Sequence, residues 1–307
     1  MDKLYDIIII GAGPAGLTAA IYASRANKSV LVLEANSYGG QIITTVGIDN
    51  YPANPGISGY DFSTKLYNQA LDLGMTYKNE KVIDIEDGKK EKSVITSKNT
   101  YKGKTIIIAT GNDSRKLNLE NEKELIGRGV SYCATCDGGF FKGREVAVNG
   151  GGNTALEEAR YLSDICKKVY LIHRRDTFRG EERKVKQLSK KENVEFILNS
   201  NVTKLNGTNK LESIEITDKD GNTSELKVSA LFVAIGRIPE NGNITKDIDT
   251  EESGYIIAGE DCKTNIDGIF AAGDNRVKSL RQLVTATSDG AIAATNAINY
   301  INERIDK

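Results

Sequence analysis

The chain has 307 residues, 39% of them hydrophobic, and its 41 lysines and arginines nearly balance 42 aspartates and glutamates. This length suggests two domains, each with a buried core. The balanced charge provides no overall field for holding nucleic acid or an anionic membrane. The early apolar run at residues 7–10 is too short for the apolar region of a signal peptide, and no later run is long enough to span a membrane. We therefore expect a cytoplasmic protein.

The first predicted unit is a strand, a glycine turn, a helix and a second strand. Residues 5–10 read as a strand buried on both faces of a parallel sheet. The G-x-G-x-x-G sequence at residues 11–16 follows, and its glycines permit a tight turn, close approach of backbone to a pyrophosphate and packing of helix on strand. The strand at residues 29–33 then ends in Glu34, whose carboxylate is suited to both hydroxyls of an adenosine ribose. This unit therefore predicts a dinucleotide site without a 2′-phosphate.

The same arrangement recurs in the middle of the chain. Residues 145–149 and 168–172 read as strands, and G-x-G-x-x-A at residues 150–155 lies between them. His173 stands as far from Gly150 as Glu34 stands from the first glycine, so the two units are in register. Glycine turns that bind nothing are the alternative, but two units in register favour two nucleotide sites.

Positive charge follows the second unit where the first has an acid. Arg174 and Arg175 come directly after His173, and Arg179 lies about one turn further on. Guanidinium groups suit a dianionic 2′-phosphate better than a bare ribose, so the second site should prefer NADPH to NADH. A solvated charged face is the alternative for the three arginines. His173 either lines this pocket or has an ordinary packing role.

Two of the four cysteines, Cys133 and Cys136, lie three residues apart. A structural zinc site needs four ligands, and only Cys166, Cys262 and His173 remain as further cysteine or histidine ligands, none of them forming a second close pair. A structural disulfide would close too small a loop to stabilise much, and cytosolic thiols stay reduced. Redox cycling of the pair remains. We expect Cys166 and Cys262 to take no part in it.

A flavin is the natural converter between a nicotinamide and a disulfide, because NADPH donates a hydride whereas a disulfide is opened by a thiolate or an electron-rich centre. Exchange with an outside disulfide also needs a proton donor for the leaving sulfur. The sole histidine is already placed in the second nucleotide unit. Asp137, directly after Cys136, is the candidate acid, since a partly buried carboxyl beside a flavin can have a raised pKa. A turn residue before Gly138 is the alternative role for Asp137.

Several motifs resemble those of known flavoproteins. The first glycine turn, Ala109-Thr110-Gly111 and the short strand ending at Asp274 resemble the FAD-binding signature of flavoprotein disulfide reductases with two dinucleotide domains. The segments GRGVSYCATCDG, GGGNTALEEA, LIHRRDTFR, AIGRIP and GIFAAGD, in this order, resemble the low-molecular-weight, bacterial-type thioredoxin reductases over essentially the whole chain. The main departures are Asn149, where an apolar residue usually precedes the glycines, and Val46, where a threonine is often found.

This resemblance implies an α/β fold of two Rossmann-like dinucleotide-binding domains. The FAD domain would cover residues 1–113 and 245–307, and the NADPH domain, residues 114–244, would be inserted into it and carry the cysteines. The crossings are rich in turn formers. The implied activity is NADPH-dependent reduction of thioredoxin, with Cys133 exchanging with thioredoxin, Cys136 facing the flavin and Asp137 acting as the acid. A homodimer and a large rotation of the NADPH domain are also implied.

The expected binding residues form two sets. The FAD set is Gly11, Gly13, Pro14, Ala15, Glu34, Gln41, Asn50, Val82, Ala109, Gly111, Asp274, Arg281, Gln282 and Leu283. The NADPH set is Gly150, Gly152, Asn153, Thr154, His173, Arg174, Arg175 and Arg179. Two other functions stay open: a flavin reductase of another small dithiol protein, either glutaredoxin-like or peroxidase-linked, and a non-catalytic dinucleotide-binding redox sensor.

Overall fold

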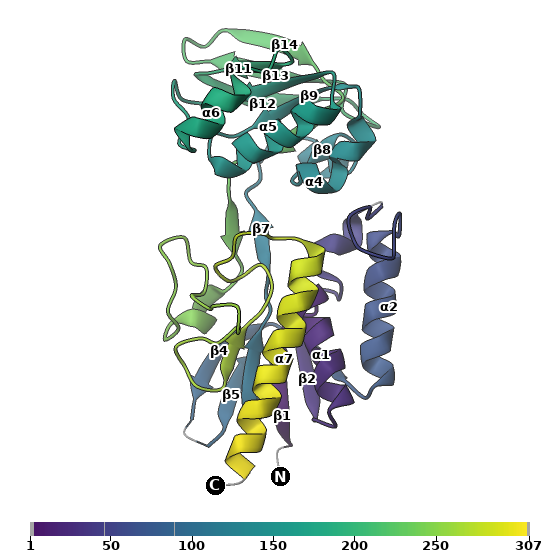
Figure 1. Ribbon diagram of the computed structural model, residues 1–307, viewed down its shortest axis with the longest axis vertical. Helices are drawn as coiled ribbons and strands as arrows, with labels where there is room; N and C mark the ends of the chain where they lie inside the picture. Colours follow the sequence, from purple (N-terminus) through teal and green to yellow (C-terminus); the bar gives the residue numbers. More distant parts are fainter. Residues whose placement is uncertain (1–2, 46, 89, 306–307) are drawn as a thin grey trace. The chain divides into compact units, whose positions relative to one another are not determined.

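The computed structural model describes residues 3–45, 47–88 and 90–305 (Figure 1), so the departure at Val46 lies outside the described residues. The chain forms two compact units, which we call unit 1 (residues 1–113 and 238–307) and unit 2 (residues 114–237). These units divide the chain after residues 113 and 237, whereas the resemblance implies an FAD segment that resumes at residue 245 after a crossing at residues 238–243. Ile244 lies between residues 237 and 245, and its side chain is buried in a core cluster of unit 1.

Unit 1 is built on a seven-stranded sheet with the order β3-β2-β1-β6-β5-β4, in which β17 also pairs with β6. Strands β1, β2, β3, β6 and β17 are mutually parallel, whereas β4 and β5 pair in antiparallel fashion. The isoleucine run of β1 is buried on both faces, as expected for a central parallel strand. The strands are β1 (Leu4–Ile10), β2 (Val30–Glu34), β3 (Thr76–Asn79), β4 (Val82–Asp87), β5 (Lys92–Thr96), β6 (Thr100–Ile108) and β17 (Ile269–Ala271).

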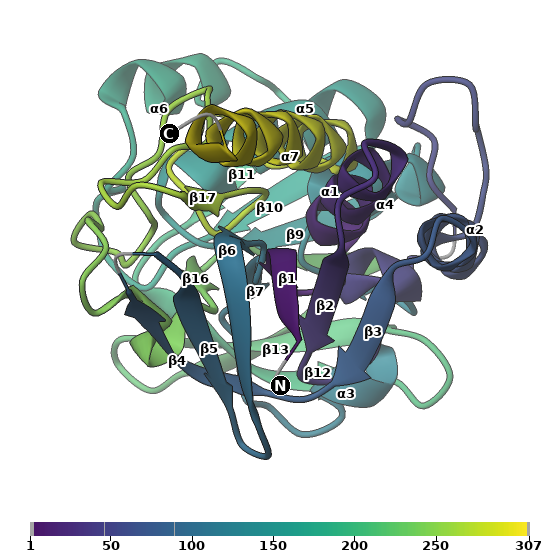
Figure 2. The ribbon, with the colours of Figure 1, turned by 90° about the horizontal axis from the view of Figure 1, so that it is seen from below.

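Helices α1 and α7 lie side by side on one face of this sheet (Figure 2). Their close approach depends on Gly290 of α7, where a Cβ atom would lie 2.2 Å from the carbonyl oxygen of Ala15. Ile244, Ile248 and Ile256 are buried together in one core cluster of unit 1. The helical elements of unit 1 are α1 (Pro14–Arg25), α2 (Gly59–Asp72) and α7 (Leu283–Ile305), with 3₁₀ turns η1 (Gly40–Thr44) and η3 (Gly242–Thr245).

Unit 2 has a five-stranded parallel sheet with the order β11-β10-β9-β15-β8, together with a three-stranded antiparallel sheet, β12-β13-β14. Its strands are β8 (Val130–Ser131), β9 (Glu145–Asn149), β10 (Lys168–Ile172), β11 (Val194–Ile197), β12 (Ser200–Asn206), β13 (Ser213–Asp218), β14 (Thr223–Lys227) and β15 (Ala230–Val233). Its helical elements are α3 (Glu122–Leu125), α4 (Ala134–Asp137), η2 (Gly138–Phe141), α5 (Asn153–Ile165) and α6 (Glu182–Leu188).

Both units contain the predicted sequence of strand, glycine turn, helix and parallel strand, which confirms the α/β fold class. Where the chain passes between the units, β7 (Asn112–Ser114) and β16 (Arg237–Pro239) pair as a two-stranded sheet. None of the helices in the described part of the chain is long and apolar enough to cross a membrane.

Candidate active site

The first glycine turn of unit 1 forms a backbone cradle. Gly11 has φ +107°, and a Cβ atom there would lie 2.3 Å from the carbonyl oxygen of Ala109, so only glycine fits. Oε2 of Glu34, at the end of β2, accepts the backbone N–H of Ala12 at 2.8 Å. The turn therefore brings together the ends of β1, β2 and β6, with the acidic residue beside the glycines. Gly13, Pro14 and Ala15 follow at the start of α1.

The segment after β17 reaches the same turn. Gly273 is close enough to α1 that its Cβ would lie 2.9 Å from the Cβ of Ala15, and its N–H donates to Oδ2 of Asp289 at 2.9 Å. Asn275 donates through Nδ2 to the carbonyl oxygen of Ile108 at 3.0 Å. One carboxylate oxygen of Asp274, between them, is fully buried. The cradle at Gly11 and the buried Asp274 oxygen fit the pyrophosphate and the polyol of an FAD.

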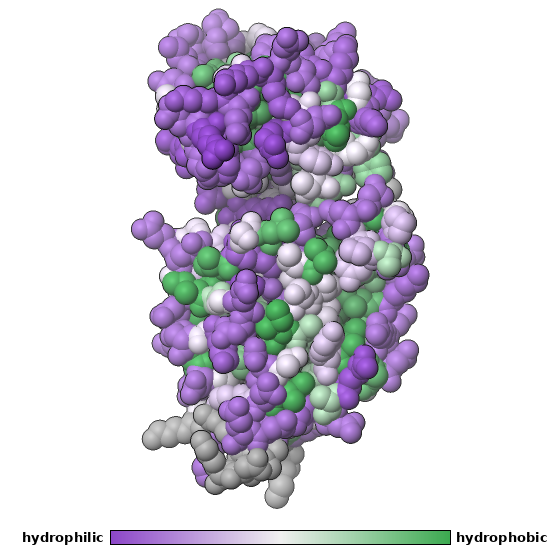
Figure 3. Space-filling view, viewed as in Figure 1, coloured by the Kyte–Doolittle hydropathy of each residue, from purple (hydrophilic) through white to green (hydrophobic). Residues whose placement is uncertain are grey.

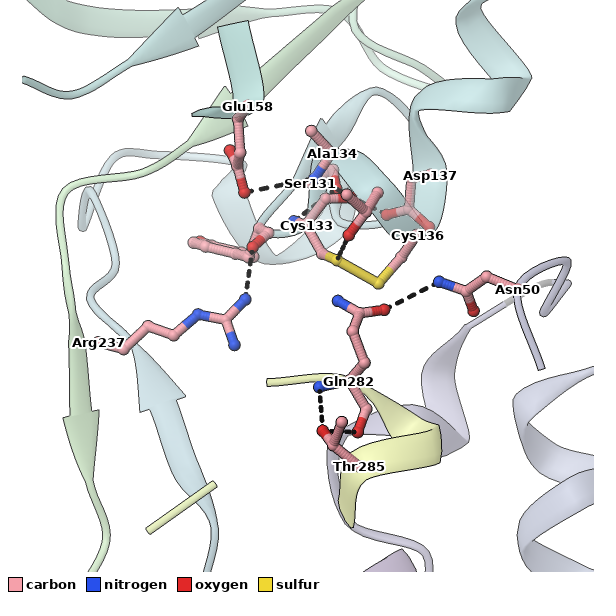
Figure 4. Close-up of a disulfide and its surroundings, with 12 residues drawn as sticks. Asn50, Ser131, Cys133, Ala134, Cys136, Asp137, Glu158, Arg237, Gln282 and Thr285 are labelled. Atoms are coloured by element: carbon pink, nitrogen blue, oxygen red, sulfur yellow. Dashed lines mark hydrogen bonds between the residues drawn. A yellow bond between two sulfur atoms is a disulfide. The ribbon is translucent and has the colours of Figure 1, made fainter. Parts of the chain in front are cut away.

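The remaining residues of the expected FAD set are spread over several elements. Asn50 donates through Nδ2 to Oε1 of Gln282 at 2.8 Å (Figure 4), so these two distant positions meet. Nε of Arg281 donates to the carbonyl oxygen of Asp274 at 3.4 Å, and its guanidinium lies 4.1 Å from the ring centroid of Tyr255.

The other members of this set, Gln41, Leu283 and Val82, lie in three different surroundings. Gln41 donates through Nε2 to the carbonyl oxygen of Asn112, in the segment after Gly111. Leu283 is buried with Ile48 and Phe62. Val82 begins β4, and Asn79 at the end of β3 donates through Nδ2 to the carbonyl oxygen of Asn36 in the segment after β2.

The second glycine turn, in unit 2, is packed in the same way. A Cβ at Gly150, where φ is +158°, would lie 2.3 Å from the carbonyl oxygen of Ala234, and Gly152 precedes Asn153 and Thr154 at the start of α5. Oδ1 of Asn153 accepts the backbone N–H of Glu181 at 2.8 Å, which holds the segment after the arginines against this helix end. The departure at Asn149 is a buried residue in the last position of β9.

His173 lies beneath this turn. Its ring occupies the space where a Cβ of Gly151 would stand, 2.2 Å from Cε1, and it stacks on Phe178 with the ring centroids 5.4 Å apart. Burial lowers the pKa of His173, a backbone hydrogen bond with Thr177 raises it in part, and the nearby arginines, Arg179 first, lower it further. The surroundings of this packed ring therefore disfavour its charged form. Its place at a phosphate stays a prediction.

The three predicted arginines are exposed near the second glycine turn. The backbone N–H of Arg179 donates to the carbonyl oxygen of Gly151 at 2.7 Å, which fixes this part of the chain beside the turn. Arg174 and Arg175 follow β10 directly. A cationic edge next to the start of α5 is suited to a phosphorylated ribose.

The cysteine pair forms a disulfide at the start of α4, with the Cα atoms of Cys133 and Cys136 5.3 Å apart (Figure 4). The carbonyl oxygen of Cys133 accepts the backbone N–H groups of Cys136 at 3.2 Å and of Asp137 at 3.1 Å. This tight turn places the carboxyl of Asp137 next to the redox pair. The predicted triad of Cys133, Cys136 and Asp137 is thus one local structure.

The Asp137 carboxyl is partly held by a serine that the sequence did not single out. Ser131 Oγ donates to Oδ2 of Asp137 at 2.6 Å and accepts the backbone N–H of Cys133 at 3.1 Å. Burial raises the pKa of Asp137, and the hydrogen bond from Ser131 lowers it in part. A carboxyl with a raised pKa can hold a proton for a leaving sulfur.

A second carboxyl, Glu158 of α5, also reaches this turn and was missed by the sequence reasoning. Its Oε1 accepts the backbone N–H of Ala134 at 3.4 Å, and burial raises its pKa to about 7. The signal was present, because Glu158 lies three residues after Ala155 and four before Leu162 and so shares their apolar helix face. A carboxyl at that position has to be buried.

Two further contacts hold the segment before Cys133. Arg237 donates through Nη2 to the carbonyl oxygen of Tyr132 at 3.3 Å. The hydroxyl of Tyr132 donates to Glu122, whose carboxylate also accepts the N–H groups of Leu117 at 2.8 Å and Asn118 at 2.7 Å. Sequence reasoning missed both anchors, and the first of them joins residues that are 105 positions apart along the chain.

The other two cysteines are buried thiols. Burial raises the pKa of Cys166 to about 11 and that of Cys262 to about 12, so neither carries an appreciable thiolate fraction at neutral pH. Among the described residues, no cluster of three or more His, Cys, Asp or Glu side chains could hold a metal ion.

The chain is similar to known proteins over nearly its whole length. A family model described as pyridine nucleotide-disulphide oxidoreductase matches residues 5–290. The chain is 45% identical over 304 residues to a thioredoxin reductase of Listeria innocua, covering 98% of this chain and 95% of that protein. It is 43% identical to a thioredoxin reductase of Bacillus subtilis, covering 98% and 96%. The crystal structure of thioredoxin reductase from Streptococcus pyogenes matches with a TM-score of 0.94 at 39% identity, covering 99% of this chain and 100% of that one.

Proposed function

Because this chain belongs to the pyridine nucleotide-disulphide oxidoreductase family, we propose that it catalyses the NADPH-dependent reduction of the thioredoxin disulfide. Electrons pass from NADPH to FAD, from FAD to the Cys133–Cys136 disulfide, and from the reduced pair to thioredoxin. The observation that carries the proposal is the Cys133–Cys136 disulfide beside the Asp137 carboxyl, whose pKa is raised by burial, in a chain with two glycine cradles.

Unit 1 is the proposed FAD domain. The Gly11 turn would hold the pyrophosphate, Glu34 the adenosine ribose and Asp274 the ribityl chain, with Asn50 and Gln282 along the flavin. Bound there, the flavin supplies the conversion of a hydride into the two electrons that open a disulfide. The support is steric at Gly11, where no side chain fits, and chemical at Asp274, whose carboxylate has a buried oxygen.

Unit 2 is the proposed NADPH domain. The N-terminus of α5 and the turn at Gly150 would bind the pyrophosphate, and Arg174, Arg175 and Arg179 the 2′-phosphate. The exposure of the three guanidiniums and the bond that holds Arg179 beside the turn support this assignment.

We call residues 133–137 the redox turn, and its side chains carry the exchange with thioredoxin. The Cys133 thiolate attacks one sulfur of the thioredoxin disulfide, and the other thioredoxin sulfur leaves and takes the proton held by Asp137. Cys136 then attacks Cys133, which re-forms the Cys133–Cys136 disulfide and releases the second thioredoxin sulfur. Two electrons leave with thioredoxin in each cycle.

We further propose that the protein is a homodimer that acts in the cytoplasm. Figure 3 shows apolar side chains on the face of unit 1 that carries α1 and α7. Tyr22 of α1, Leu280 before α7 and Val284 of α7 are 48%, 52% and 40% exposed, and a partner subunit on this face would cover them. The cytoplasm supplies NADPH and keeps thiols such as Cys166 reduced. Light scattering of the purified protein checks the dimer, because a monomeric mass would contradict it.

The deciding experiment is NADPH-dependent turnover of the flavin-loaded protein with thioredoxin, and in parallel with a glutaredoxin-like protein. We expect rapid thioredoxin reduction that is abolished in Cys136→Ser, while NADPH still reduces the flavin of this variant. Turnover retained in Cys136→Ser would overturn the role of the pair. A preference for the glutaredoxin-like protein would favour the alternative reductase, and a flavin that NADPH does not reduce would favour a non-catalytic sensor.

A further inference from the structure

Glu158 is a buried acid that the proposed exchange does not use. It lies on α5 with only 8% of its surface exposed, on the same helix face as Ala155 and Leu162. A charged carboxylate on such a face is unfavourable unless it is paired. Packing alone therefore does not explain why a glutamate occupies this position.

The Glu158 carboxyl points at the redox turn. Oε1 accepts the backbone N–H of Ala134 at 3.4 Å, and Ala134 directly follows Cys133 (Figure 4). Oε2 is fully buried, and no described residue donates to it. The carboxyl thus lies on the interior side of the turn that carries the disulfide. Oε1 accepts a hydrogen bond from the turn, and Oε2 can carry a proton.

The groups around Glu158 favour the protonated form. Desolvation is the largest effect, and Asp137 of α4 and Glu157 of α5 disfavour a further negative charge. Arg237 of β16 opposes them, but its guanidinium donates to the Tyr132 carbonyl. Lys184 of α6 pairs with Glu157 instead.

The other elements packed against α5 contribute apolar side chains. Strands β9 and β10 and the turn η2 contribute apolar side chains of the same core cluster, among them Val146, Leu171 and Phe141. Any change of charge at the neighbouring sulfurs is therefore felt in a poorly solvated site, where electrostatic effects are strong.

We propose that Glu158 is a positioning residue of the redox turn whose carboxyl gains a proton when the Cys133–Cys136 disulfide is reduced and releases it when the disulfide re-forms. The proposal rests on the dithiol cycle of the proposed function. It makes Glu158 the second proton-holding group of that cycle, beside Asp137.

The charge balance of the cycle explains why Glu158 would gain a proton when the disulfide is reduced. Two electrons, which a bound FAD would supply, break the sulfur–sulfur bond and leave two thiolates. The negative charge of the thiolates raises the affinity of nearby acids for protons. Solvent supplies one proton to the Glu158 carboxylate. When the two electrons pass to the thioredoxin disulfide, the negative charge leaves the turn and Glu158 returns its proton to solvent. Asp137 serves the leaving sulfur, and Glu158 compensates charge.

The test measures how the disulfide–dithiol equilibrium of Cys133 and Cys136 depends on pH. The full-length, flavin-loaded protein is equilibrated with oxidised and reduced dithiothreitol from about pH 5 to pH 9, trapped by alkylation and quantified by mass spectrometry. Glu158→Gln keeps an acceptor for Ala134 but cannot titrate. As pH rises, the wild-type equilibrium should shift toward the disulfide more than that of Glu158→Gln does. The extra shift should reach up to about tenfold per pH unit over part of the range around neutrality.

Glu145→Gln is the matched control, because it removes a partly exposed carboxylate of the same unit, one that pairs with Lys167. This control should follow the wild type. Parallel curves for wild type and Glu158→Gln would overturn the proposal. Neither NADPH nor thioredoxin enters the assay, so a wrong substrate assignment and a wrong role for Glu158 give different results.

Infrared difference spectroscopy keeps the proposal testable if Glu158→Gln does not fold. Reduction of the wild-type disulfide should create the band of a newly protonated buried carboxylic acid, which shifts in heavy water. The band should persist in Asp137→Asn, because Asp137 is then absent and Glu158 remains. Loss of the band in Asp137→Asn, or its absence from the wild type, would overturn the proposal.

Discussion

The hydroxyl of Ser131 lies 2.6 Å from Oδ2 of Asp137 and also accepts the backbone N–H of Cys133 at 3.1 Å. One short side chain therefore fixes the acid and the first cysteine relative to each other. Because the hydroxyl donates to Asp137, it stabilises the anionic form and opposes the effect of burial on the pKa of this carboxyl.

Replacing Ser131 by Ala should raise the pKa of Asp137. The acid must be protonated to serve the leaving sulfur, so thioredoxin reduction falls as pH rises through this pKa. A hydrogen bond to a charged group contributes about 1.5–3 kcal/mol, which corresponds to roughly one to two pH units. We expect the alkaline limb of kcat/KM for thioredoxin to move upward by about this amount. Ser131→Thr keeps the hydroxyl and should leave the limb in place, whereas a downward shift in Ser131→Ala would contradict the interpretation.

Arg174→Ala should weaken NADPH binding without affecting NADH. Loss of a charge-assisted hydrogen bond of ~1.5–3 kcal/mol raises the KM for NADPH about tenfold or more, since NADH has no 2′-phosphate to lose. Lys167→Ala removes an exposed cation at the other end of β10 and should change neither KM. Steady-state kinetics with both nucleotides measure this. Equal losses for NADPH and NADH would refute the role in 2′-phosphate binding.

Much of the fold could be predicted because its determinants are local. The isoleucine run of β1, the glycines after it and Glu34 lie within one short segment, and the same holds for β9 and Gly150. Two strands that are joined by one helix then pair in parallel, because the helix returns the chain to the same end of the sheet. The sequence therefore predicted both glycine turns and the position of the cysteine pair.

The residues that surround the redox turn could be predicted less well, because they meet through the tertiary structure. Arg237 reaches the Tyr132 carbonyl across about a hundred residues of sequence, and Glu158 reaches Ala134 from another helix. The domain boundary at residue 238 depends likewise on the burial of Ile244 in unit 1, which the turn formers around it conceal.

Gly151→Ala should destabilise unit 2 through His173. The new Cβ would stand 2.2 Å from Cε1 of the imidazole, so the ring has to leave its place against Phe178. Overpacking of this kind typically costs about 1–3 kcal/mol. Urea denaturation of Gly151→Ala, His173→Ala and the double variant gives the coupling. The double variant should be more stable than the sum of the single losses predicts, and strict additivity would show that the clash is not with His173.

Glu158 should make the stability of the protein depend on pH in a direction opposite to that of most acids. Its pKa is raised from 4.5 in the unfolded chain to about 7 in the folded one. Between these values the folded protein binds a proton that the unfolded chain has lost. The free energy of unfolding therefore falls as pH rises from about 4.5 to about 7, and this contribution is constant above that range.

The size of this effect follows from the shift, since each pKa unit corresponds to about 1.4 kcal/mol, and the full shift to about 3 kcal/mol. Urea denaturation of the oxidised protein at a series of pH values measures it as the difference between wild type and Glu158→Gln, which cancels the titration of all other groups. The stability of the wild type relative to Glu158→Gln should decline from acid to neutral pH and then level off. A difference that stays constant with pH, or that rises, would mean that the buried Glu158 carboxyl does not hold a proton in the folded protein.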